Sequence, residues 1–161
     1  MNGQWIGKYS GTNTGEIVVN IDDFRSSYRG VAYLNESNAS LPGSAALFET
    51  SDKESDFKFT AEVVPIHPHT RNIDSWENVK VFYPPNVIVP KSAEVHGTWN
   101  NEVLKLSWTT DIGTTGTCEL PKSRADEGSQ GQVFSLKSLS RSGVTRSGVR
   151  SCQLPQPSKG N

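Results

Sequence analysis

The sequence predicts an all-β fold, a small antiparallel barrel or sandwich of about eight strands. Short segments of alternating apolar and polar residues are separated by Asn, Gly and Asp turns, and helical periodicity is scarce. A glycine two residues before a tryptophan, in Gly3-Gln4-Trp5, returns as Gly97-Thr98-Trp99. Glycine allows close backbone approach and an indole fills the space beside it. We therefore expect these two segments on strands whose tryptophans plug one end of the fold.

Five strands are predicted in the first 64 residues. The second shows the clearest alternation, with Ile17, Val19 and Ile21 inward, and the fifth places Phe57 and Phe59 on one face. In the first strand the aromatic residues and Gly7 share a face, and small residues keep one face of the third strand thin. The five predicted strands cover residues 4–10, 16–22, 28–34, 45–50 and 56–64.

Residues 65–90 form the most irregular part of the chain, with five prolines in 26 residues. Within them Asp74-Ser75-Trp76-Glu77 predicts one short helix, because an N-cap residue is followed by an acid in the first turn. Residues 79–83 fit either a continuation of that helix or a brief edge strand. The last three strands are expected at residues 93–100, 103–110 and 114–120, with a tight hairpin turn at residues 100–101.

Charge and aromatic content divide the chain into two parts. Residues 129–161 contain five of the sixteen basic residues, no acid and one aromatic residue, so eleven basic and seventeen acidic residues remain in 1–128. All four tryptophans lie in 1–128, which we expect to form the folded all-β domain. The basic Ser/Arg/Gly-rich tail, residues 129–161, is expected to be disordered. An acidic domain lacks the clustered Lys and Arg that phosphate binding requires, so the folded part is not expected to bind nucleic acid.

The sequence predicts a cytoplasmic protein that is not bound to a membrane. No apolar run approaches the roughly 18–20 residues of a membrane helix, and the first residues do not form a signal peptide. The two cysteines, Cys118 and Cys152, have neither a metal-binding spacing nor the density of a disulfide scaffold. Cys118 is expected to be a small buried hydrophobic residue on a strand.

Aromatic residues are the main candidates for binding. Those on the strands either line a ligand cavity or fill a solid core, and a solid core is favoured because eight-stranded barrels can be filled by side chains alone. Trp76 and Tyr83, beside prolines, are expected to be exposed and to form a patch for a protein partner. The strand candidates are Trp5, Tyr9, Phe57, Phe59, Trp99 and Trp108.

Catalytic and metal-binding patterns are weak. His67 and His69 have a spacing that can hold a metal ion, with Asp74 as a third ligand, but the same spacing is common in proline-rich loops without metal. Acids such as Glu36 and the pair Asp22-Asp23 are expected to be solvated turn residues. No nucleophile is paired with a base in a known motif, and no phosphate-binding loop is present. We therefore expect a protein that is not an enzyme and uses no cofactor.

Two family resemblances accompany these patterns. The Gly-x-Trp pattern on an early strand resembles lipocalins and the wider calycin group. A longer series of matches, over about residues 1–128, resembles the N-terminal region of bacterial FRG-domain-containing proteins. Its pieces are Gly3-Gln4-Trp5-Ile6-Gly7, Thr12-Asn13-Thr14-Gly15, Asn20-Ile21-Asp22, Thr109-Thr110-Asp111-Ile112-Gly113-Thr114, Leu120-Pro121-Lys122-Ser123 and Ala125-Asp126.

The second resemblance implies a C-terminal FRG domain after this region, and the sequence has only 33 residues there, which predicts a truncated or frame-shifted product. The resemblance carries no functional residues over to this chain. It favours a non-catalytic recognition or regulatory module that is normally fused to an FRG effector domain. Its expected partner is that missing domain, another protein or a small signal molecule. The alternative is a lipocalin-like binder of a small hydrophobic ligand.

Overall fold

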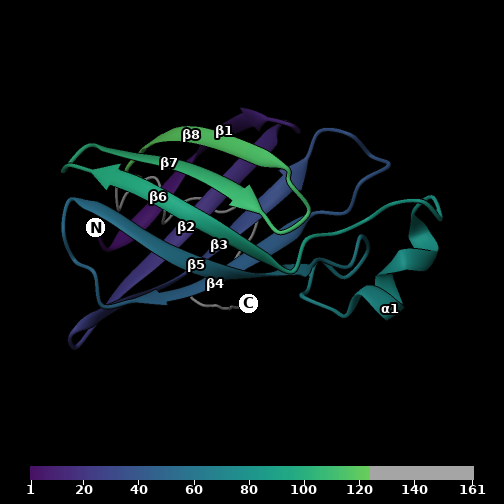
Figure 1. The fold of residues 1–161 in the computed structure, drawn as a ribbon, viewed down its shortest axis with the longest axis horizontal. Helices are drawn as coiled ribbons and strands as arrows, with labels where there is room; N and C mark the ends of the chain where they lie inside the picture. The colour runs from purple at the N-terminus through teal and green to yellow at the C-terminus, as the bar shows by residue number, and fades with distance from the viewer. Residues whose placement is uncertain (124–161) are drawn as a thin grey trace. The chain divides into compact units, whose positions relative to one another are not determined.

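Eight antiparallel strands close into a barrel in the order of the chain (Figure 1), which confirms the predicted fold class. The computed structural model describes residues 1–123, so the predicted tail at 129–161 lies outside the described residues. Each predicted strand is present, with ends within two residues of those expected. The strands are β1 Gly3–Gly11, β2 Gly15–Phe24, β3 Ser27–Glu36, β4 Ser44–Thr50, β5 Asp56–Pro65, β6 Ser92–Trp99, β7 Val103–Thr110 and β8 Thr115–Pro121.

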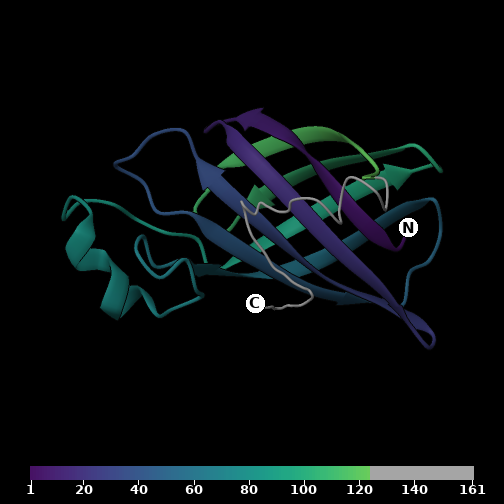
Figure 2. The same cartoon turned by 180° about the vertical axis from the view of Figure 1, so that it is seen from behind.

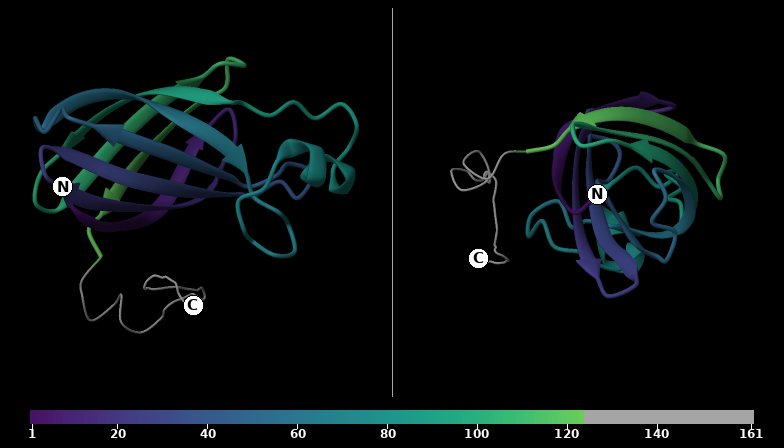
Figure 3. Two further views of the ribbon diagram at one scale, coloured as in Figure 1. Left: turned by 90° about the horizontal axis from the view of Figure 1, so that it is seen from below. Right: turned by 90° about the vertical axis from the view of Figure 1, so that its left-hand side faces the viewer.

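The barrel closes where β1 meets β8. Tyr9 lies opposite Cys118 and Gly11 opposite Gly116 in an antiparallel ladder, and an isolated bridge joins Trp5 to Lys122. Seen along its axis, the strands surround a common centre (Figure 3, right). The sequence left a barrel and a sandwich open, and this closure decides for a barrel. Closure also pairs both edges of the sheet, which removes the unpaired backbone groups of an open edge.

The two ends of the barrel differ. We call the end formed by residues 12–14, 37–43, 66–91 and 111–114 the loop end, because it has the long connections. The opposite end, the N-terminal end, is formed by the first two residues and by residues 25–26, 51–55 and 100–102. Figures 1 and 2 show the N-terminus on the side of the barrel away from α1.

Inward-facing aromatic residues lie directly opposite glycines on the neighbouring strand. The register pairs Phe48 with Gly30, Phe57 with Gly97, Trp108 with Gly116 and Tyr9 with Gly15. A Cβ at Gly97 would lie 2.4 Å from the Phe57 ring, and one at Gly116 would lie 2.3 Å from the Trp108 ring. The missing side chains therefore make the room that these rings occupy.

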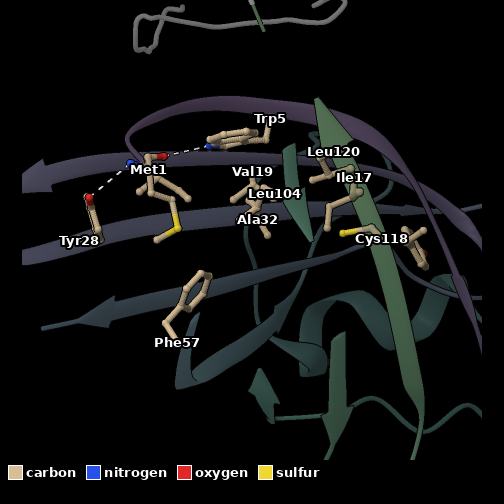
Figure 4. Packing of buried hydrophobic residues seen from close by; sticks show 12 residues of the cluster. Met1, Trp5, Ile17, Val19, Tyr28, Ala32, Phe57, Leu104, Cys118 and Leu120 are labelled. Atoms are coloured by element: carbon tan, nitrogen blue, oxygen red, sulfur yellow. Dashed lines mark hydrogen bonds between the residues drawn. The ribbon is translucent and has the colours of Figure 1, made fainter. Parts of the chain in front are cut away.

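Side chains fill the N-terminal end of the barrel (Figure 4). The Trp5 indole is buried, and its Nε1 donates a hydrogen bond to the Met1 carbonyl at 3.0 Å. The Met1 amino group donates to the Tyr28 hydroxyl at 3.3 Å. Leu104 and Leu120 are completely buried beside them. These contacts support the prediction that the tryptophan of the first strand plugs one end of the fold.

The segment of residues 66–91 contains the one helical region of the described chain. Helix α1, Trp76–Val79, continues into a 3₁₀ turn, η1 Lys80–Phe82, so residues 79–82 continue the helix and Tyr83 is extended. The Ser75 hydroxyl caps α1 by accepting a hydrogen bond from the Asn78 N–H. Helix α1 packs on β5 and buries Val79. No helix within residues 1–123 is long and apolar enough to cross a membrane.

The turn between β2 and β3 lies further along the chain than the predicted turn at Asp22-Asp23. Asp22 and Asp23 belong to β2, which runs on to Phe24, and the turn falls at Arg25 and Ser26. Arg25 takes a positive φ of 57°, a conformation that non-glycine residues seldom adopt. The prediction of a turn at Asp22-Asp23 was therefore wrong. Exposed acids at the end of a strand and acids of a turn look alike in the sequence.

Candidate binding cavity

The interior of the barrel encloses a cavity of about 270 Å³. Small inward-facing residues of four strands leave this space, because Ala32, Ala46, Ala61 and Ala93 stand where larger side chains would meet at the axis. The rest of the wall is mainly apolar and includes Ile17, Val19, Leu34, Phe57, Leu104 and Trp108. The expectation of an interior completely filled by side chains is therefore wrong.

The aromatic candidates of the sequence divide between the cavity and the packed core. Tyr9 and Trp108 line the cavity together, with their ring centroids 5.8 Å apart. Trp5 lies in the packed N-terminal end and is not part of the cavity wall. Trp99 packs against the core, and its buried Nε1 has no hydrogen-bond partner in the described part of the chain.

Three phenylalanines form a continuous stacked wall on one side of the cavity. The Phe48 and Phe59 rings stack with centroids 4.5 Å apart, and Phe57 stacks on Phe59 at 5.8 Å. They lie where the ladder between two strands is short, because β4 pairs with β5 only from Ser44 to Leu47. Aromatic packing between side chains therefore seals the wall where backbone hydrogen bonds between these two strands end.

The loop end exposes apolar residues around the cavity. Ile88 and Ile112 contribute to the cavity wall, yet 73% and 39% of their surfaces are exposed to solvent. Leu41 and Pro42 from residues 37–43 join them in the wall. Apolar side chains that face both a cavity and solvent are typical of the rim of a binding site for an apolar molecule.

One polar pair lies inside this apolar wall. The Tyr9 hydroxyl donates a hydrogen bond of 2.8 Å to Glu36 Oε2, and both residues line the cavity. Glu36 Oε1 is buried and has no hydrogen-bond partner among residues 1–123. Burial raises the pKa of the Glu36 carboxyl, an effect that the Tyr9 hydrogen bond partly opposes. Burial and the neighbouring carboxylate raise the pKa of the Tyr9 hydroxyl, which therefore stays protonated and donates.

Glycine at position 15 makes room for this pair. Gly15 lies opposite Tyr9 on one side and Glu36 on the other. A Cβ at that position would lie 1.9 Å from the Asn35 carbonyl oxygen and 2.9 Å from the Tyr9 hydroxyl. The polar pair thus occupies a place that the neighbouring strand leaves free.

Glu36 was wrongly expected to be a solvated turn residue. It ends β3 and follows Tyr28, Gly30, Ala32 and Leu34 at every second position, all of which face inward. Extending the period-two pattern of this strand by one step would have placed the carboxyl inside the barrel. The polar residues that follow it concealed this signal.

The remaining candidates lie on the segment of residues 66–91. Trp76 stacks on Tyr83 with ring centroids 6.4 Å apart, as a pair separate from the cavity wall. Both residues are half-buried, so the prediction that they are exposed was wrong, because the stacked rings cover each other. The His67 and His69 rings both contact Phe82 edge-on at 5.0 Å. His67 Nδ1 accepts hydrogen bonds from the backbone N–H groups of His69 and Thr70, which occupies one of its two ring nitrogens.

Metal ligands do not gather in the described chain. Residues 1–123 contain no group of three or more His, Cys, Asp or Glu side chains placed to hold a metal ion. Cys118 is buried on β8, as predicted, and burial raises the pKa of its thiol to about 12. A thiol with such a pKa is protonated at neutral pH and is a poor nucleophile.

The fold and the cavity define a class: a small, closed, up-and-down antiparallel barrel with a mainly apolar interior and one partly buried acid–phenol pair. Comparisons with protein-family models, curated proteins and solved structures find no match. The function of the barrel is therefore inferred from its geometry.

Proposed function

We propose that this barrel is a non-catalytic module that binds a small, mainly apolar molecule in its interior. The observation that carries the proposal is the cavity of about 270 Å³, walled by apolar side chains and rimmed by exposed Ile88 and Ile112. Closed barrels of eight strands can hold one small ligand in this way. The proposal follows the second of the two functions that the sequence suggested, the binder of a small hydrophobic ligand.

The cavity volume limits the size of the ligand. At about 30 Å³ per water molecule in the liquid, 270 Å³ is the space of roughly nine waters. A chain of eight carbons with one polar head group matches that space. Burial of eight carbon groups at about 0.8 kcal/mol each contributes about 6 kcal/mol to binding, which the lost freedom of the ligand opposes.

A substitution that fills the cavity tests the proposal. Val95 lines the cavity, whereas its neighbour Glu94 is exposed on the outer face of the same strand. We expect Val95→Trp to weaken binding of the fluorescent probe 1-naphthylamine at least tenfold, and Glu94→Trp to leave it unchanged. Circular dichroism and thermal unfolding establish that both variants are folded.

Two outcomes would overturn this proposal. One is failure of the wild-type barrel to bind the naphthylamine probe, 1-octanol or any other probe of matching size. The other is undiminished probe binding by a folded Val95→Trp variant, because the probe would then be bound outside the cavity.

The segment of residues 66–91 favours a second candidate function, recognition of a protein. In the turn η1, Val81 is 75% exposed and Phe82 is 44% exposed, so apolar side chains are presented to solvent. The resemblance to FRG-domain-containing proteins makes an FRG domain one of the expected partners. Titration of the barrel with a separately produced FRG domain tests this. Binding that Val81→Glu weakens supports it, and the absence of binding contradicts it.

A further inference from the structure

The charged side chains in the cavity wall are of one sign. Glu36 is the only acidic side chain in the wall formed by residues 1–123, and no lysine, arginine or histidine side chain contributes to it. Met1 also lines the cavity, at its N-terminal end, and the Met1 amino group there donates to the Tyr28 hydroxyl. A ligand inside the cavity therefore meets a carboxyl group and no basic side chain.

The carboxyl group has unused hydrogen-bonding capacity. Glu36 Oε2 accepts from Tyr9, but Oε1 is shielded from solvent without a donor. A buried acceptor that lacks a partner is unfavourable, and a donor supplied from the cavity relieves this after a rotation of the side chain. The ligand group that does so must carry N–H or O–H hydrogens.

Aromatic rings beside the carboxyl group favour positive charge. Tyr9 and Trp108, 5.8 Å apart, both face the cavity, and the Tyr9 hydroxyl contacts Glu36 directly. The faces of tyrosine and tryptophan rings attract cations, and the attraction grows where water is excluded. Opposite charge near a buried carboxylate also stabilises its ionised form.

We propose that the ligand is a cationic amphiphile, an apolar chain or ring with one primary ammonium group placed at Glu36. This inference rests on the proposed function, because it concerns the occupant of the same cavity. The apolar body lies along the wall of Phe48, Phe57 and Phe59, which offers stacked rings and no charge. Fatty acids are disfavoured, because a carboxylate at this position would face Glu36, and the one ammonium group of the lining residues, that of Met1, lies at the N-terminal end and donates to Tyr28.

Three ligands of nearly equal size separate the head group from the apolar body. Octylamine, 1-octanol and octanoate share an unbranched eight-carbon chain and carry an ammonium, a hydroxyl and a carboxylate group. We expect calorimetric titration at neutral pH to show octylamine binding at least tenfold more tightly than octanoate. 1-Octanol is expected to lie between them.

The Glu36→Gln variant tests whether the Glu36 carboxyl binds the ammonium group of octylamine. This variant is expected to weaken octylamine binding at least fivefold and to leave 1-octanol binding within twofold. Glu16→Gln is the matched control, because Glu16 faces outward on the adjacent strand and its loss changes the net charge equally. Octylamine binding to that control is expected to equal binding to the wild type.

These measurements test separately whether the cavity binds a ligand and whether it prefers an ammonium group. Binding of 1-octanol with no preference for octylamine over octanoate would overturn the inference and leave the proposed function intact. A preference for octylamine that survives in Glu36→Gln would also overturn it, because the ammonium group would then bind elsewhere. Failure of all three ligands and of the naphthylamine probe would overturn the proposed function.

Discussion

Glu36 is the residue whose environment differs most from what its position in the chain suggests. Its backbone is the last of β3, next to a polar loop, while its carboxyl lies inside an apolar wall with a single donor, the Tyr9 hydroxyl. Burial of a carboxyl group disfavours its ionised form, and that cost must be met by the rest of the fold. Polar groups kept at such a cost are frequent in binding sites.

The raised pKa of Glu36 predicts how pH affects folding. The carboxyl has its ordinary pKa of 4.5 in the unfolded chain and a higher pKa in the barrel, so the folded state holds the proton more tightly. Its stabilising contribution is fully present below the unfolded pKa and is lost as the pH rises through the folded pKa. We therefore expect Glu36→Gln to remove a decrease in the free energy of unfolding that the wild type shows above about pH 4.5.

Urea unfolding between about pH 4 and about pH 8 measures this difference. Glu16→Gln serves again as the control, because that side chain is exposed and its replacement should leave the pH dependence as in the wild type. A Glu36→Gln profile parallel to that of the wild type would contradict the prediction.

At the scale of the strands, the recurring feature is a glycine opposite each of four inward-facing aromatic residues. This pairing lets large rings lie flat over the neighbouring strand, so that they occupy the wall and leave the axis of the barrel open. It shows how a chain rich in inward-facing aromatic residues can still enclose a cavity. The sequence reveals the glycines and the rings, but not which of them face each other.

Gly116→Ala tests this pairing. The added methyl group would lie 2.3 Å from the Trp108 ring, and overpacking of a well-packed interior costs about 1–3 kcal/mol. We expect a decrease of this size in the free energy of unfolding, together with a shift in tryptophan fluorescence as the Trp108 indole moves. Chemical denaturation measures the first and emission spectra the second.

Thr117→Ala is the matched control, because Thr117 is the exposed neighbour of Gly116 on β8. Its replacement is expected to cost less than about 0.5 kcal/mol, as is usual for surface positions. A second comparison combines Gly116→Ala with Trp108→Phe, which shortens the opposing ring. Additive effects in the double variant would show that the two positions do not interact and would contradict the pairing.

For the molecule as a whole, the fold was far easier to predict than the site. The strands were recognisable because residues such as Ile17, Val19 and Ile21 alternate with polar neighbours, and the helix because Ser75 supplies an N-cap. The cavity depends on long-range register, which brings Ala32, Ala46, Ala61 and Ala93 around one axis. No local pattern contains that information, so a filled and an open interior could not be distinguished.

The strand ladders of the closed barrel are of unequal length. β2 and β3 pair over ten positions, from Gly15 and Glu36 to Phe24 and Ser27, whereas β4 and β5 pair over four and β1 and β8 over three. Local opening requires the least free energy where the fewest backbone hydrogen bonds must break. The β4–β5 and β1–β8 ladders should therefore open before the long hairpin of β2 and β3.

Amide hydrogen exchange measured by NMR tests this order. We expect the slowest amides in β2 and β3, with faster exchange in the part of β5 from Phe57 to Ala61, where no ladder to β4 exists.

A bound cavity ligand at a concentration of 100 times its dissociation constant adds about 2.7 kcal/mol of stability, which slows exchange through global unfolding about 100-fold. Because β5 supplies Phe57 and Phe59 to the cavity wall, the ligand should also slow its local opening. Uniform exchange in all eight strands would contradict the order of opening, and ligand protection confined to residues outside the barrel would contradict binding in its interior.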